Sequence, residues 1–355
     1  MSQPRKEKTC ISAVRPGAIL ANPVIREGDG YVVLAEGTVL TQGHINRLRS
    51  LSVNYLDITH PAELDLAALE RFAATYISVV ADLKNAFATI RCFGEVPLCQ
   101  MKELVEGRIR PLAEARGVIN HLRRMRRQDD YTYYHSVNVA IICGVLGKWV
   151  GYTGREIQDL ILAGLLHDIG KTKISLAILN KPGRLSPSEM EEMSMHAIYG
   201  YQLLRKYKGL PESILRGVLE HHERIDGSGY PHQLEHKRLH PFACVIAVAD
   251  IYDAMTSDRV YQKKRSPFAV VEEINTAMFG KLDPCICTTF LNNVKDYFIG
   301  SIIRLSDGRE AEVVFMEGRA ASRPVVRTQQ GEFIDLEVAS HIAIVGIAET
   351  VINKA

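Results

Sequence analysis

The amino-acid sequence predicts a mainly α-helical protein with a small β-rich segment at each end. Between about Ala62 and Asn293, apolar residues recur every three or four positions, which is the period of helices buried on one face. Before this region, short β-branched runs alternate with glycine turns, as in GAILANPVI and EGDGYVVLAEGTVL. After it, the chain from Tyr297 returns to strand-like runs, with a hairpin signal at Asp307-Gly308.

Each helical segment has its own sequence signal. TQGHINRLRSLSV predicts a short helix with Thr41 as its N-cap, and apolar residues follow helical spacing over 66–87 and again over 101–112. SPSEMEEMSMHAIYGYQLL begins with a capping box, in which Ser186 is the N-cap and Glu189 the N3 residue. PFACVIAVADIYDAM is apolar on most sides, which indicates a buried central helix.

These changes of pattern predict four regions. A small β-rich N-terminal module occupies residues 1–61, and amphipathic connecting helices occupy residues 62–128. A helical domain follows over residues 129–295, and a short β-strand tail over 296–355. The terminal segments could pack on each other or on the helical domain, or serve in regulation or assembly. The connecting helices are equally compatible with a homodimer interface and with a bundle inside one chain.

Composition and charge exclude some classes of function. The 355 residues include 43 basic and 41 acidic side chains, so nothing predicts bulk binding to duplex nucleic acid or to an anionic membrane. The longest apolar run, Val139 to Gly147, is too short to span a bilayer, and no signal-peptide core follows the N-terminus. The seven cysteines form no CxxC pair, which is typical of a reducing compartment. We therefore expect a cytoplasmic protein, and a small anionic ligand remains possible because it needs only local charge.

Histidines are concentrated in the helical region. Eight of the twelve lie between His135 and His240, several of them in apolar segments where an unpaired polar group costs free energy. In LILAGLLHDIGK, His167 and Asp168 end a buried helix and need partners. One such histidine is usually an ordinary core or surface residue, but five such segments in succession favour a metal site.

Imidazole and carboxylate ligands suit iron, manganese, nickel or zinc. Two such ions about 3.5–4 Å apart can hold the attacking and the leaving oxygen of a phosphoryl transfer, and a carboxylate can bridge them. Asp168 is the natural bridge. The candidate ligands are His135, His167, Asp168, His196, His221, His222 and Asp250.

The stretch HHERIDGSGYP places two histidines side by side before a turn. Adjacent residues on a helix point about 100° apart, so a frayed helix end is needed to bring both rings to one site. Gly227 and Gly229 are expected to adopt positive φ, and Pro231 to fix the exit from the turn. His196 is expected in the middle of the helix that Ser186 begins.

The motifs HDIGK and HHERIDGSGYP resemble those of the HD-GYP family, a branch of the HD phosphohydrolase superfamily. The resemblance continues in family order through YTYYHSVNVA, ILNKPGRLSPSEMEEMSMHAIYGYQLL, IAVADIYDAMTSDRVY and LDPCICTTFL, from Asp129 to Asn293. It implies a helical HD-type catalytic domain with two or three metal ions, often iron. It also implies hydrolysis of cyclic di-GMP to pGpG, and sometimes onward to GMP, by a metal-activated hydroxide.

The resemblance assigns a role to each candidate residue by position. One metal would be held by His135, His167, Asp168 and Asp250, and the other by Asp168, His196, His221 and His222. Lys171 would face the scissile phosphate as a catalytic residue together with Asp168, and Tyr230 and Arg259 would bind the substrate. The positive charges of Lys171 and Arg259 would offset charge that grows on the phosphoryl oxygens.

Two positions depart from the family pattern. Members with three metals carry a glutamate one helical turn before the first ligand histidine, where this chain has Tyr131. We therefore expect two divalent ions, iron or manganese before nickel or zinc, although Asp129 and Asp130 are close enough to compensate. Gln262 replaces a basic residue after the RxY tyrosine, so the phosphate contact is expected to move to Lys263 or the substrate affinity to fall.

Two other functions remain open. The domain could be a catalytically weak module that binds a cyclic dinucleotide or docks a protein partner such as a diguanylate cyclase. It could also be a phosphodiesterase for another cyclic dinucleotide, 3′,3′-cyclic GMP-AMP.

Overall fold

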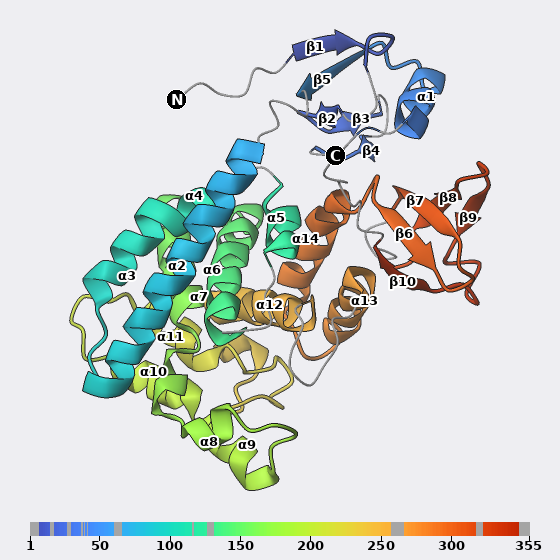
Figure 1. The fold of residues 1–355 in the computed structure, drawn as a ribbon. Helices are drawn as coiled ribbons and strands as arrows, with labels where there is room; N and C mark the ends of the chain where they lie inside the picture. Colours follow the sequence, from blue (N-terminus) through green and yellow to red (C-terminus); the bar gives the residue numbers. More distant parts are fainter. Residues whose placement is uncertain are drawn as a thin grey trace. The chain divides into compact units, whose positions relative to one another are not determined.

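The structure is a computed structural model of the chain. It describes residues 7–14, 18–26, 30–36, 38, 40, 42–59, 66–115, 117–125, 131–256, 266–316 and 322–347. Helices predominate in the middle of the sequence and strands occur at both ends, which confirms the predicted fold class (Figure 1). The chain forms two compact units: Met1–Phe72, Ser266–Glu272 and Leu291–Ala355 make unit 1, while Ala73–Arg265 and Glu273–Phe290 make unit 2.

Unit 2 is helical. Its elements are α2 (Leu66–Phe93), α3 (Leu98–Leu104), the π-helical turn η1 (Val105–Ile109), α4 (Arg110–Ala113), α5 (Val118–Arg124), α6 (Tyr131–Val150), α7 (Gly154–Leu166), the 3-10 turn η2 (Ile169–Lys173), α8 (Leu176–Leu179), α9 (Pro187–Ser194), α10 (His196–Leu204), α11 (Glu212–Glu220), η3 (His236–Arg238), α12 (Pro241–Thr256), α13 (Pro267–Ala277) and α14 (Pro284–Val294). Parts of α2, α13 and α14 belong to unit 1.

The core of unit 2 forms around α6, α7, α11 and α12. α6 packs against α7 and α12, and α11 packs against α7, α10 and α12. α12 is buried on most sides, as its apolar sequence predicts. Among the residues that the structure describes, no helix is both long enough and apolar enough to cross a membrane.

The capping box at Ser186 and Glu189 is confirmed, but the helix that it begins is shorter than predicted. α9 ends at Ser194, and a new helix, α10, begins at His196 after a turn at Met195. The amide of Met195 donates to the carbonyl of Glu192, three residues back, which is the tighter spacing of a 3-10 turn. His196 therefore stands at a helix start, and the prediction that it lies mid-helix was wrong.

Unit 1 contains the strands. A three-stranded antiparallel sheet has the order β1-β5-β2, and β3 pairs with β4. A five-stranded antiparallel sheet near the C-terminus has the order β10-β6-β7-β8-β9. The elements are β1 (Glu7–Cys10), β2 (Ile19–Leu20), β3 (Val24–Ile25), β4 (Val32–Leu34), α1 (Gln42–Ser50), β5 (Tyr55–Thr59), η4 (Lys295–Tyr297), β6 (Ile302–Leu305), β7 (Glu310–Phe315), β8 (Val325–Thr328), β9 (Phe333–Asp335) and β10 (Ile344–Ile347).

The predicted hairpin at Asp307-Gly308 joins β6 to β7, and Gly308 has the positive φ of +87° that favours glycine there. The helix predicted over TQGHINRLRSLSV is α1. Its expected N-cap, Thr41, lies outside the described residues.

The two ends of the chain contact each other through a buried charged cluster. Glu312 on β7 lies 2.8 Å from His44 Nε2 and 3.7 Å from Arg47 of α1, and Arg327 of β8 donates to it at 2.7 Å. Only 6% of the Glu312 side chain is exposed. The sequence left the packing of the terminal segments open, and this cluster joins them.

Glu312→Gln is expected to lower the free energy of unfolding of unit 1 by about 2 kcal/mol, because it leaves the partly buried guanidinium groups of Arg47 and Arg327 without their counter-charge. Burial acts to raise the pKa of Glu312, but His44 and Arg327 outweigh it and hold that pKa below its usual value. A lowered folded pKa gives stability that is present above the unfolded pKa of about 4.3 and is lost as pH falls through the folded pKa.

Denaturation of the wild type and the variant from pH 7 to pH 3 measures this effect. The difference in free energy of unfolding between the wild type and Glu312→Gln should be largest at pH 7 and should shrink below about pH 4. Glu332→Gln is the matched control, since Glu332 pairs with Arg309 at an exposed position and should change the unfolding curve little. A pH-independent difference would contradict the assignment to the Glu312 charge.

Candidate metal centre

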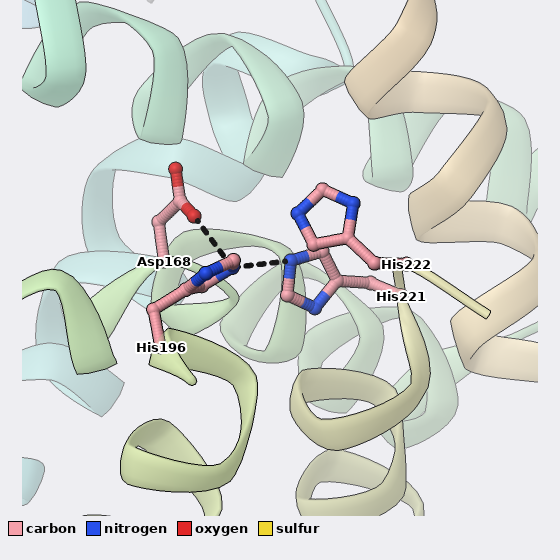
Figure 2. A group of neighbouring side chains, drawn as sticks. All are labelled: Asp168, His196, His221 and His222. Atoms are coloured by element: carbon pink, nitrogen blue, oxygen red, sulfur yellow. Dashed lines mark hydrogen bonds and ion pairs between the residues drawn. The ribbon is translucent and has the colours of Figure 1, made fainter. Parts of the chain in front are cut away.

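The seven predicted ligands come together in unit 2 as two neighbouring groups. Within each group, the ligand atoms all lie within 4.8 Å of one another. The groups are Asp168, His196, His221 and His222, and His135, His167 and Asp250. They are the two sets that the family resemblance implied, apart from Asp168, which was expected in both. Figure 2 shows the first group, with the side chains directed toward one another.

Three of the histidines share one local geometry. His167 and His221 stand at the C-terminal ends of α7 and α11, and His196 follows the turn that ends α9. In each, Nδ1 lies 2.7 Å from the backbone carbonyl three residues earlier. The last carbonyls of a helix have no partner within the helix, so the imidazole supplies one. Because a carbonyl can only accept, Nδ1 carries the proton and Nε2 presents a lone pair.

These lone pairs face one another. Nε2 of His196 lies 3.2 Å from Nε2 of His221 and 3.4 Å from Oδ1 of Asp168. Burial lowers the pKa of His196 to about 4 and holds the pKa values of His221 and His222 well below the usual range, so these rings are neutral near pH 7. Lone pairs at these distances repel unless a cation lies between them, which is the arrangement that a metal ion stabilises.

Asp168 lies between the two groups. Its Oδ1 faces His196, whereas its Oδ2 lies 3.3 Å from His167 Nε2, 3.8 Å from His135 Nε2 and 2.5 Å from Lys171 Nζ. Burial acts to raise the pKa of Asp168, but Lys171 and the histidines lower it well below its usual value, so it is a carboxylate. Oδ1 of Asp168 and Nε2 of His167 are buried without a hydrogen-bond partner among the described residues. The donor set therefore fits two cations bridged by this carboxylate.

The second group is organised around His135. Its Nε2 lies 3.1 Å from Oδ1 of Asp250, and Oδ2 of Asp250 lies 3.9 Å from Nδ1 of His222. Burial acts to lower the pKa of His135, but hydrogen bonds with Asp250 and Asp253 raise it to about 9. A proton and a metal ion therefore compete for Nε2 of His135.

The predicted substrate residues are only partly within the described chain. Lys171 is bound to Asp168 and a quarter of its side chain is exposed. The ring of Tyr230 lies 4.7 Å from that of His222, with an angle of 30° between the planes. Arg259 and Lys263 lie outside the described residues.

The backbone of the turn after the paired histidines differs from the prediction at one of its two glycines. Gly227 has a φ of +76°, as expected, but Gly229 is not among the residues with positive φ, so that prediction was wrong. A Cβ on Gly229 would lie 2.4 Å from the backbone of Glu223 and Arg224, so glycine is needed for close approach. The buried carboxylate of Glu223 accepts from the amides of His232 and Leu234. The sequence alone did not reveal this role of Glu223, although an acid directly after two candidate ligands was a signal.

Comparison with known proteins agrees with the site. Residues 110–286 match the family model described as HD domain. The chain is 32% identical over 268 residues to "Cyclic di-GMP phosphodiesterase PA4108" of Pseudomonas aeruginosa, covering 75% of this chain and 64% of that protein. It is 34% identical to "Cyclic di-GMP phosphodiesterase" of Thermotoga maritima, over 52% of this chain and 50% of the relative. It is also 32% identical to "3'3'-cGAMP-specific phosphodiesterase 1" of Vibrio cholerae, over 49% and 41%.

The chain thus spans between about two fifths and two thirds of the length of these relatives. A solved structure of Bd1817, a HDG"Y"P protein from Bdellovibrio bacteriovorus, matches with a TM-score of 0.51 at 16% identity, over 82% of this chain and all of the other, and shares the fold. The chain is an HD-domain protein. Within that class it is related to the HD-GYP cyclic di-GMP phosphodiesterases, which confirms the resemblance of its motifs.

Proposed function

We propose that the protein is a metal-dependent phosphodiesterase that hydrolyses cyclic di-GMP to pGpG, with GMP as the further product that the family resemblance allows. The observation that carries this proposal is the position of Asp168, whose two oxygens face buried imidazoles of different ligand groups. Two divalent ions bound there would make water a nucleophile at neutral pH and would neutralise charge on the phosphodiester. His135, His167, Asp168 and Asp250 would hold one ion, and Asp168, His196, His221 and His222 the other.

Among the residues that the structure describes, Lys171 is the cation best placed to act on the phosphate. Its ammonium lies against Asp168, at the edge of the ligand set, and its side chain is partly exposed. The backbone beneath it is fixed, because Arg91 donates to the carbonyls of Lys171 and Ile174 at 2.8 and 2.9 Å. A cation held in place before the reaction stabilises developing negative charge at little reorganisation cost.

Tyr230 would bind the substrate beside the second ligand group. Its ring lies over His222, and burial raises the pKa of its phenol above the usual value, so the hydroxyl stays protonated and can donate to a phosphate or guanine. Arg259 and Lys263 are assigned to the substrate phosphates by resemblance to the family. Imidazole and carboxylate ligands support iron or manganese as the metal, with nickel or zinc as alternatives.

The test uses the full chain, purified without air. Its metal content is measured, and turnover of cyclic di-GMP is then compared after chelation and after reloading with Fe²⁺ or Mn²⁺. Hydrolysis to pGpG and GMP should require the metal and should be faster than hydrolysis of 3′,3′-cyclic GMP-AMP.

The same assay separates the competing functions. Faster turnover of 3′,3′-cyclic GMP-AMP than of cyclic di-GMP would make 3′,3′-cyclic GMP-AMP the substrate, as the name of the Vibrio cholerae relative states for that protein. A fully loaded protein that binds cyclic di-GMP or a diguanylate cyclase without forming product would instead be a binding or docking module, and the phosphodiesterase proposal would be wrong.

A further inference from the structure

A chain of hydrogen bonds runs from helix α2 to the candidate ligand His135. The hydroxyl of Tyr76 donates to Oδ1 of Asn138 at 2.6 Å, and Nδ2 of Asn138 donates to Oδ1 of Asp253 at 2.8 Å. The other oxygen of Asp253 accepts from Nδ1 of His135 at 2.7 Å. All four side chains are buried: Tyr76 is 1% exposed and Asn138 is 6% exposed.

We infer that Tyr76 is a positioning residue for the metal centre, acting through Asn138 and Asp253 to fix the orientation of His135. This inference rests on the proposed function, because it assumes that His135 is a metal ligand. Tyr76 lies on α2, outside residues 110–286 that match the HD domain, so the family match assigns it no role.

The orientation of His135 depends on Asp253. A carboxylate that accepts from Nδ1 fixes the ring plane and directs Nε2 toward Asp250 and Asp168, where a metal ion would replace the proton of Nε2. His135 differs here from the three histidines whose Nδ1 is held by a backbone carbonyl. Its support is a side chain on another helix, which can rotate unless it is held in turn.

Asn138 provides that second constraint. Only its NH₂ group can face the carboxylate of Asp253, so its carbonyl oxygen is directed away and must find a donor in the core. Tyr76 donates to this oxygen. Each donor in the chain points toward the carboxylate, an arrangement in which the bonds polarise one another. Without the hydroxyl, a buried carbonyl oxygen loses its bond and the amide loses a constraint on its position.

Tyr76→Phe tests the role of the hydroxyl alone. The ring contact with Tyr134, at 5.9 Å between centroids, stays available to phenylalanine. Tyr207→Phe is the matched control, because the Tyr207 hydroxyl accepts from the amide of Val96 at 2.7 Å and has no bond to the ligand set. Both variants remove one hydroxyl from unit 2.

The primary measurement is Mn²⁺ binding to the full chain after its metals have been removed with a chelator. Replacing an outer partner of a ligand histidine weakens metal binding about 10- to 100-fold, so a partner two bonds further out is expected to weaken it about fivefold. Tyr207→Phe should bind Mn²⁺ as the wild type does. In protein with ¹⁵N-labelled histidine, the His135 Nδ1 resonance should shift in Tyr76→Phe only.

A double-mutant cycle tests whether Tyr76 acts through Asn138. In an Asn138→Ala background, Tyr76→Phe should cause no further loss of Mn²⁺ affinity. Unchanged affinity in Tyr76→Phe, equal losses in Tyr76→Phe and Tyr207→Phe, or full additivity in the cycle would each overturn the inference alone. Failure of the wild type to bind Mn²⁺ or Fe²⁺ would overturn it together with the proposed function.

Discussion

Asp168→Asn is expected to lower the turnover of cyclic di-GMP at least about a thousandfold and to reduce the metal content of the purified protein. Metal ions supply several kcal/mol of transition-state stabilisation, and about 4 kcal/mol corresponds to a thousandfold. Asp168 faces ligands of both groups, so losing its charge weakens both sites together. A change at a ligand that faces only one group should reduce the metal content less.

The same substitution should leave the fold of the metal-free protein intact. In the wild type, Oδ1 of Asp168 is buried without a hydrogen-bond partner among the described residues and lies opposite the lone pair of His196. The amide of asparagine can donate to that lone pair, which replaces a repulsion by a hydrogen bond. The substitution also removes the ion pair between Asp168 and Lys171, which opposes this gain. The thermal midpoint of the metal-free variant is therefore expected to fall by no more than a few degrees below that of the metal-free wild type.

Turnover, elemental analysis and thermal unfolding measure these effects in parallel. Asp159→Asn is the control, because Asp159 lies on α7 beside the exposed Arg155 and away from the ligand set. It should keep the turnover and the metal content of the wild type. Turnover in Asp168→Asn close to that of the wild type would rule out a bridging role for this carboxylate.

The sequence predicts the ligand set well because its signal is local. A histidine or an aspartate in an apolar helix is visible residue by residue, as with His167 in LILAGLLHDIGK. The orientation of these side chains also depends partly on local contacts. Three of the imidazole rings point toward the site because each donates to a backbone carbonyl three residues earlier. The sequence did not reveal this, since it depends on where each helix ends, and the end of α9 was misplaced.

The support of the site depends on contacts distant in sequence. Asp253 is 118 positions from His135, and Tyr76 is 62 positions from Asn138. No periodicity links such pairs, so the sequence alone does not show that Asp253 orients His135. The cluster around Glu312 is hidden for the same reason, with His44 and Arg327 at opposite ends of the chain. Patterns of hydrophobicity locate elements, whereas the pairing of buried polar groups requires coordinates.

A close backbone contact holds the two ligand-bearing segments of the site together. A Cβ on Gly170, in η2, would lie 1.9 Å from the carbonyl oxygen of His196 and 2.5 Å from the amide nitrogen of Gly200. η2 follows directly after Asp168, and α10 begins with His196. The absence of a side chain at Gly170 therefore permits the approach that places Asp168 Oδ1 3.4 Å from His196 Nε2.

Gly170→Ala is expected to lower the free energy of unfolding by about 3 kcal/mol and turnover by at least about tenfold. The methyl group would meet backbone atoms, which no rotamer change can move aside, so η2 and α10 must separate and the distance between Asp168 and His196 must grow. Gly107→Ala is the control, since its Cβ would point into open space away from its own helical turn, and a helical glycine gains up to about 1 kcal/mol on replacement by alanine. Chemical denaturation and Mn²⁺ binding measure both effects. If Gly170→Ala behaved like Gly107→Ala, the contact between η2 and α10 would not be what sets the geometry of the site.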